Sequence, residues 1–288
     1  IQMKKVLKKL YFGCKQIIQA VVSILSVIAF SRPGISRKLK NSKVKCKDIC
    51  VVLGNGPSLV GELEYLYSVK SEVDFIAVNA FCKSDYFRIL QPSNYILLDG
   101  QFFAPRDERN VKLSQEVLEC FKKVDWPMNL ILSVEHRKIH YEERIQNKNI
   151  TTVYVNDASI GGPEWLRNYI YDKQWGMPKC QTVLIAAIYL PIYLRYKEVY
   201  VYGADHSWTR DLRVDENNVL CYGDRHVYNT NLTEIKMQYG IADLLLYYSN
   251  MFASHNLLRS YSNHVKVPVY NATEGSFVDA YERKKLSI

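Results

Sequence analysis

The sequence predicts an α/β fold, with a Rossmann-like, mostly parallel sheet flanked by helices and a lid segment. Two observations support this. From Lys47 onward, short apolar runs alternate with stretches of helical periodicity. The apolar run 49–53 then leads directly into the glycine turn Gly54-Asn55-Gly56-Pro57-Ser58. An apolar strand, a tight turn and a helix in that order are typical of a parallel α/β sheet.

The same alternation places the individual elements. Strands are expected near 49–53, 74–79, 94–98, 129–133, 151–155, 198–202 and 267–270. Helices are expected at about 58–70, 110–123, 181–195 and 232–262. With 288 residues, 48% of them hydrophobic, the chain can bury one substantial core. A homo-oligomer is therefore allowed but is not needed for folding.

Residues 1–46 are predicted to be a basic, amphipathic segment that associates with a membrane, and 47–288 to be the catalytic domain. Residues 17–30 are apolar but shorter than the ~18 residues of a spanning helix, so we expect them to lie on a bilayer. Many of the cations behind the net charge of +9 flank this run. A signal peptide and a helix packed on the domain are the alternatives. Nucleic acid is not expected, because aromatic residues do not interleave with the charge.

Composition also bears on redox state and metals. The seven cysteines are odd in number and lack C-x-x-C spacing, which indicates a reducing compartment and argues against disulfides or zinc. No D-x-D triplet occurs in the chain. We therefore expect neither a metal nor a cofactor.

Polar residues follow several predicted strands directly: Asn55, Asn79, Asp99 and Asp205. In open α/β sheets ligands bind outside the carboxyl ends of the strands, so these four should line one crevice. Gly54 and Gly56 are expected to adopt positive φ or to allow close approach, leaving backbone amides that face an anion. The turn lacks the third glycine of the dinucleotide fingerprint.

Three of these pieces resemble a known family. Asn55-Gly56-Pro57-Ser58 after an apolar strand, Asn79 after the next, and Gly203-Ala204-Asp205 after a later one resemble the bacterial sialyltransferases of the Campylobacter type, glycosyltransferase family 42, and related Rossmann-like glycosyltransferases. The resemblance extends from about Asp48 to His226 in ordered pieces. It implies a GT-A-like variant of the fold and metal-independent transfer of an acidic, sialic-acid-like or Kdo-like sugar from a CMP-activated donor.

The resemblance also implies partners and a location. The acceptor would be a surface glycan, possibly lipid-linked, of lipopolysaccharide or capsule biosynthesis. The protein would then lie peripherally on the cytoplasmic face of the bacterial inner membrane, held by its N-terminal segment.

Donor-binding residues are carried over position by position from the resemblance. They are Gly54, Asn55, Gly56, Ser58, Asn79, Asp99, Thr182, Gly203, Asp205 and Ser207. Two of them depart from the family pattern. Asp99 stands where the family has asparagine, and a carboxylate repels a neighbouring anion; alternatively, Asp99 only caps a helix or turn. Ser207 stands where the family has a tyrosine for the leaving phosphate, and Trp208 or Tyr222 would have to compensate.

Residues 207–230 form the predicted lid, a long polar stretch after a strand end. The resemblance makes His226 the general base, and an imidazole suits that role because it titrates near neutrality. His206, next to Asp205, is the competing candidate. His255 and His264 are expected to be structural or exposed. Asn271, Thr273 and Ser276 belong to a second glycine turn that either faces the crevice or is a simple turn.

Two other functions fit parts of the sequence. One is a pterin pyrophosphokinase-like enzyme, which would require ATP and Mg²⁺. The other is a non-catalytic glycan- or nucleotide-binding subunit of a polysaccharide assembly, which the serine at 207 favours.

Overall fold

The computed structural model describes residues 2–42, 44–227 and 229–288. Its centre is an eight-stranded sheet in the order β11-β10-β6-β1-β2-β3-β4-β5, in which each pair of neighbours is parallel. The strands are β1 Ile49–Leu53, β2 Val73–Val78, β3 Asn94–Leu97, β4 Met128–Ser133, β5 Ile150–Val155, β6 Glu198–Tyr202, β10 Val269–Asn271 and β11 Glu282–Arg283. The predicted Rossmann-like fold class and all seven predicted strands are confirmed.

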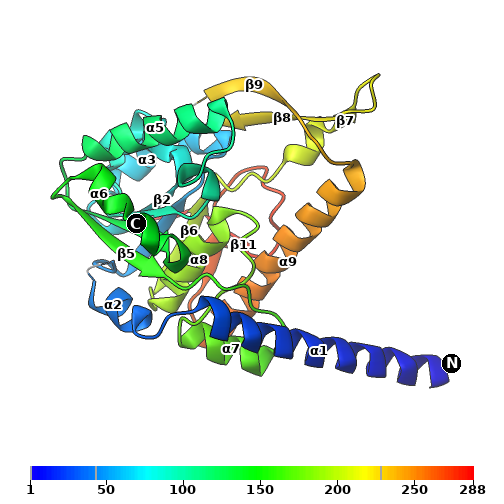
Figure 1. Ribbon diagram of the computed structural model, residues 1–288. Helices are drawn as coiled ribbons and strands as arrows, with labels where there is room; N and C mark the ends of the chain where they lie inside the picture. Colours follow the sequence, from blue (N-terminus) through cyan, green and yellow to red (C-terminus); the bar gives the residue numbers. More distant parts are fainter. Residues whose placement is uncertain (1, 43, 228) are drawn as a thin grey trace.

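The strands are apolar along their length because helices cover both faces of the sheet. In β1, Val51 and Leu53 pack into one apolar cluster, whereas Cys50 and Val52 pack into another. Successive side chains of a strand point to opposite faces, so β1 joins both cores. Figure 1 shows α3 and α5 on one side of the sheet and α7 and α8 on the other.

The flanking helices begin where the sequence supplies a cap. Asp107 accepts a hydrogen bond from the Asn110 amide at the start of α5, and Thr182 accepts one from the Leu184 amide at the start of α8. The helices up to β6 are η1 Pro57–Glu62, α3 Leu63–Ser68, η2 Asn79–Lys83, α4 Tyr86–Leu90, η3 Gly100–Phe102, α5 Glu108–Lys122, η4 Val134–Ile139, α6 Tyr141–Ile145, α7 Glu164–Asp172 and α8 Val183–Tyr193. The helix expected at 58–70 is thus a 3₁₀ helix followed by a short α-helix.

The helix predicted at 232–262 is wrong in its first part. The helix α9 spans Ile241–Val265, whereas β9, Asn229–Lys236, pairs with β8, Leu220–His226, as an antiparallel hairpin. β7, Arg213–Val214, adds a third strand, and η5, Trp208–Asp211, precedes it. Threonines and an isoleucine within 229–236 favour a strand. Most of the predicted lid 207–230 therefore lies in η5 and in a small sheet next to α9 (Figure 1); residue 228 lies outside the described residues.

The N-terminal helix α1 spans Gln2–Phe30 and runs along the base of the molecule, with its free end projecting past α9 (Figure 1). Within it, Leu10–Phe30 forms a run of 21 residues with a mean hydropathy of 1.7, long and apolar enough to cross a membrane by length and composition. The apolar run is thus longer than the predicted 17–30, because Leu10, Tyr11 and Phe12 extend it toward the N-terminus.

The second half of α1 rests on the backbone between β5 and α7. The Ser23 hydroxyl donates to the Gly161 carbonyl at 3.1 Å, and a Cβ at Gly162 would come within 3.0 Å of the Ala20 nitrogen. α2, Ile35–Asn41, follows, and Leu39 and Val44 are fully buried in the core. Residues between α1 and β1 therefore contribute to the packed domain.

Candidate functional site

A pocket of about 440 Å³ lies at the carboxyl ends of the central strands. Asn55 follows β1, Asn79 follows β2, Asp99 follows β3, and Gly203 and Asp205 follow β6; all five line the pocket. The remainder of the lining comes from the start of α8, from η5 and the hairpin, and from the first turns of α9. We call the strand ends with the start of α8 the floor, and the other segments the wall.

Ten of the twelve residues expected at the site line this pocket: Asn55, Gly56, Asn79, Asp99, Thr182, Gly203, Asp205, His206, Ser207 and His226. Gly54 and Ser58 do not. The roles of all twelve residues in binding and catalysis remain predictions. Ten of them, from segments far apart in the chain, do lie at one pocket.

The glycines of the first turn are required for close packing. A Cβ at Gly54 would come within 2.3 Å of the Gly203 carbonyl oxygen, and one at Gly56 within 1.7 Å of Asp205 Oδ2. Gly54 and Gly56 do not use the positive φ that glycine permits, whereas Gly203, with φ 68°, does. These glycines let the ends of β1 and β6 touch.

The amides of this turn are already bonded within the protein. The Gly54 amide donates to the Tyr202 carbonyl and the Gly56 amide to the Gly203 carbonyl, at 2.8 and 2.9 Å. The Ser58 amide and hydroxyl donate to the two Asp205 carboxylate oxygens, at 3.4 and 2.7 Å. Burial raises the pKa of the Asp205 carboxyl, and the bonds from Ser58 oppose that rise. The expected anion site on free amides is therefore wrong, because the Asp205 carboxylate occupies it.

Several buried polar atoms of the floor have no hydrogen-bond partner within the described residues. They are Asn55 Oδ1, Asn79 Oδ1 and Gln181 Oε1. Asn55 Nδ2 donates to the Val78 carbonyl at 3.3 Å, which fixes which end of that amide stays unpaired. An unpaired buried acceptor costs about 1–3 kcal/mol, so these three oxygens at the pocket are available to accept hydrogen bonds from a bound molecule. Sequence reasoning missed Gln181, although it directly precedes the expected residue Thr182.

Asn79 is held in an unusual conformation, with φ 47° in the left-handed region that asparagine tolerates better than most residues. Its carbonyl accepts from the Tyr95 hydroxyl, which itself accepts from the Cys82 amide. These contacts, in a fully buried strand layer, keep the unpaired amide oxygen at the pocket.

Asp99 and Thr182 both act as helix caps. Asp99 accepts from the Gln101 amide at 3.2 Å and from its side-chain amide at 2.7 Å, which is the capping role weighed against donor contact. Thr182 uses its oxygen to accept from Leu184, so its hydroxyl hydrogen can still be donated to a ligand.

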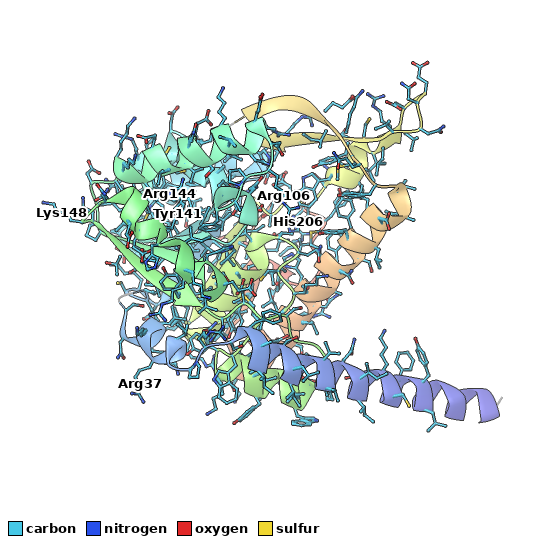
Figure 2. The ribbon with its side chains drawn as sticks, viewed as in Figure 1. Arg37, Arg106, Tyr141, Arg144, Lys148 and His206 are labelled. Carbon is cyan, nitrogen blue, oxygen red and sulfur yellow. The ribbon has the colours of Figure 1, made fainter. Side chains whose placement is uncertain are left out.

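The two candidate histidines differ in surroundings. His206 is 5% exposed, has φ 48°, and stacks on Trp208 with ring centroids 4.9 Å apart. Burial lowers its pKa to about 4, so the ring is neutral at neutral pH, and its Nε2 has no partner among the described residues. Figure 2 shows His206 inside the molecule, between the sheet and α9.

His226 lies at the end of β8 and is half-buried at the pocket. The next residue, Val227, is buried, and its amide donates to the Asn55 carbonyl at 2.8 Å. This bond joins the hairpin to the glycine turn 54–58. It therefore holds the end of β8, which carries His226, next to the floor.

His255, His264 and the second glycine turn lie outside the pocket. His255 is fully buried with its Nδ1 3.1 Å from the Tyr281 hydroxyl, and His264 lies near the end of α9. In the second glycine turn, Thr273 accepts from the Ala204 amide and Ser276 donates to the Ala204 carbonyl. These hydrogen bonds hold the turn against the end of β6, and the turn does not line the pocket.

Charges and aromatic rings of the lining complete the site. Asp99, Asp205 and Asp211 are its carboxylates, and Arg225 on β8 contributes a cation. Within the described residues, no group of three or more His, Cys, Asp or Glu side chains could hold a metal ion. The wall adds five aromatic residues, Trp208, Tyr222, Tyr239, Tyr247 and Tyr248. The tyrosines near the start of α9 were not predicted, though the pair Tyr247-Tyr248 is visible in the sequence.

Comparison with known proteins places the fold. No protein-family model and no curated protein matches the sequence. The structure resembles that of the MAf glycosyltransferase from Magnetospirillum magneticum AMB-1, with a TM-score of 0.51 and 13% identity over 87% of this chain. The match covers 37% of that protein, so this chain corresponds to little more than a third of its length. The protein therefore has a glycosyltransferase-like, Rossmann-type α/β fold.

Proposed function

We propose that the protein is a glycosyltransferase that moves a sugar from a CMP-activated donor to a glycan acceptor. The observation that carries the proposal is the cluster of unpaired amide oxygens on Asn55, Asn79 and Gln181, in a pocket that His226 also lines. The similarity of the fold to a solved glycosyltransferase supports the reaction class. The sequence resemblance to the family 42 sialyltransferases supports CMP as the carrier.

The amide cluster suits a nucleoside. Cytosine offers an exocyclic amine and ribose offers hydroxyls, and these groups can donate to the three acceptors. The first turn, in contrast, is closed to a phosphate by Asp205. We therefore place the nucleoside at the floor and the phosphate toward Ser207, Thr182 and Arg225, which supply hydroxyls and a cation. Arg225 can also pair with the carboxylate of an acidic sugar. Asp99 and Asp211 would repel that carboxylate, so it should lie nearer to Arg225 than to either of them.

The proposed reaction is a direct displacement with His226 as general base. The acceptor hydroxyl attacks the anomeric carbon of the donor sugar, and His226 takes the hydroxyl proton. The bond from that carbon to the phosphate oxygen breaks, and CMP leaves with the electron pair. A monophosphate carries less charge than a diphosphate, so hydroxyls and Arg225 can stabilise its departure without a metal.

We further propose that the protein lies on an anionic bilayer, on the cytoplasmic face of the bacterial inner membrane, where a lipid-linked surface glycan would be its acceptor. Exposed apolar residues run along α1 from Leu10 to Phe30. On the neighbouring α7, Trp165 and Tyr169 are 71% and 51% exposed and share a face with Lys173. Aromatic residues and lysine are typical of a membrane interface. Binding of the full chain to anionic vesicles at low salt would support this placement; no binding under these conditions would contradict it.

A melting series tests the donor. CMP or CDP should raise the melting temperature more than ATP, NAD or UDP-sugars, because binding to the folded state alone stabilises it. Asn79→Gly is the informative variant: glycine accepts φ 47° and removes the unpaired oxygen. The shift with CMP should shrink while the unliganded protein melts no lower. Equal shifts with all nucleotides, or a shift with NAD alone, would overturn the proposal.

A further inference from the structure

The pocket wall carries two sets of aromatic rings. The inner set is Trp208 between His206, at 4.9 Å, and Tyr248, at 5.8 Å, with interplanar angles of 28° and 18°. The outer set is Tyr239 and Tyr247, whose rings lie 6.4 Å apart and 15° from parallel. The inner rings stack on one another, and the outer two, which also stack, form a ledge at the start of α9.

Both rings of this ledge are partly exposed at the pocket. Tyr239 is 39% and Tyr247 52% exposed, and both line the pocket. Ligand pockets are lined largely by apolar and aromatic side chains, so this open ring surface is available to a ligand. The two rings are also nearly parallel and stacked, so an outward ring face offers a flat apolar surface with a hydroxyl group at its edge.

A flat aromatic surface of this kind fits a sugar ring. One face of a pyranose consists of C–H groups that pack on an aromatic ring, while its hydroxyls point outward to hydrogen-bonding partners. A nucleobase would also stack on such rings. However, the unpaired acceptors that suit a nucleoside lie on the floor, on Asn55, Asn79 and Gln181.

His226 lies at the floor end of the hairpin, whereas Tyr239 follows its other end. His226 ends β8, and the bond from Val227 to Asn55 fixes that end of the hairpin against the floor. Tyr239 lies between β9 and α9, and Tyr247 lies on α9, so both belong to the wall. A base that deprotonates an acceptor has to lie between the acceptor and the donor.

We propose that Tyr239 and Tyr247 form the acceptor subsite, on which one sugar ring of a glycan stacks while another sugar of the same glycan presents its hydroxyl to His226. This inference rests on the proposed glycosyltransferase function and adds the place and chemistry of acceptor recognition. Ring faces, and not the tyrosine hydroxyls, supply the binding.

Steady-state kinetics on the full chain test the subsite. Tyr239→Ala and Tyr247→Ala should each raise the acceptor KM by about tenfold, with the donor KM and the rate of donor hydrolysis unchanged. Tyr239→Phe and Tyr247→Phe should stay near wild type. Tyr67→Ala is the matched control, since Tyr67 on α3 is 50% exposed and lies outside the pocket.

Three kinetic outcomes would overturn the inference. Unchanged acceptor KM in both alanine variants removes the subsite, and a raised donor KM assigns the ledge to the nucleotide. Phenylalanine variants as weak as the alanine variants assign binding to the hydroxyls.

A binding measurement separates this inference from the reaction itself. Saturation-transfer NMR with lactose and a panel of neutral mono- to tetrasaccharides needs no turnover. Saccharide binding that is lost in Tyr247→Ala and kept in Tyr67→Ala upholds the subsite even if no CMP-sugar is ever consumed, in which case the proposed function alone fails. If wild type binds no saccharide and both alanine variants transfer sugar normally, the subsite fails while the function stands.

Discussion

The floor and the wall of the pocket are built in different ways. The floor consists of strand ends in the middle of a buried parallel sheet, where the Gly54 and Gly56 amides are bonded and Asn79 is fixed in a left-handed conformation. The wall consists of an antiparallel hairpin and the exposed start of α9, with half-buried His226 and open Tyr247. A rigid floor suits recognition of a constant part of the ligand, whereas a separate wall can hold groups that act on variable parts.

The sharpest test of this division is the base. His226→Ala should lower kcat by about 10²–10⁴-fold with little change in donor affinity, because proton removal stabilises the transition state alone. His206→Asn should affect donor affinity more than kcat, because His206 adjoins the floor; asparagine also accepts φ 48°. Initial rates and CMP melting shifts on the same preparations measure both. Normal turnover in His226→Ala with an inactive His206→Asn would move the base to the floor.

The second test concerns stability and pH. Burial lowers the pKa of His206 to about 4, whereas an unfolded histidine titrates near 6.5. Below about pH 6.5 the unfolded chain therefore binds a proton that the folded chain does not, so stability is complete above that pH and falls as pH drops toward 4. The loss for His206 alone reaches roughly 3 kcal/mol.

Urea unfolding at pH 7.5, 6 and 5 measures this slope. His206→Asn should flatten it, although buried His255, whose pKa is also lowered by burial, keeps part of it. A variant without His206 that loses stability as steeply as wild type would show that His206 accepts its proton in the folded state.

A third comparison uses two glycines. Gly56→Ala places a methyl group 1.7 Å from an Asp205 oxygen and should cost about 1–3 kcal/mol of stability, together with nucleotide binding. Gly240→Ala, at the wall, meets no atom within 4 Å and should be nearly neutral. Urea midpoints and CMP melting shifts give both results. A neutral Gly56→Ala would show that the floor adapts as readily as the wall.

The smallest effect is expected from metal removal. Excess EDTA should leave the transfer rate unchanged, because the described residues hold no group of carboxylates, histidines or cysteines spaced for a metal ion. Product formation with and without EDTA checks this. A strict Mg²⁺ requirement would favour the diphosphate-forming pterin type of reaction.

The floor was more predictable than the wall, for physical reasons. The bounds of β1 and β6 follow from the sequence to the residue, because strands covered on both faces are unbroken apolar runs. The polar residues after them then meet at one edge of the sheet. The hairpin was missed because residues 232–236 were interpreted as the beginning of α9, although Thr233 and Ile235 favour a strand and Gly240 separates them from the helix.

Other features of the site depend on partners distant in the chain. The amides near Ser58 look free in the sequence, and Asp205, which bonds Ser58, lies 147 residues away. Gln181 matters because its side-chain oxygen is buried without a partner. That burial arises only when β2, α8 and the glycine turn 54–58 pack together, so it is not visible in the sequence. The ledge of Tyr239 and Tyr247 likewise exists only after the hairpin has set the start of α9 beside it.

The contact of α1 with Gly161 and Gly162 has a mechanical consequence. A helix seated directly on backbone, with Ser23 bonded to Gly161 and no side chain between, has little freedom to swivel on the domain. If α1 lies on a bilayer as proposed, the pocket stands at a set height and tilt above the lipid. The protein would then select acceptors by two properties. One is the sugar that carries the reactive hydroxyl, and the other is the distance of that hydroxyl from the membrane.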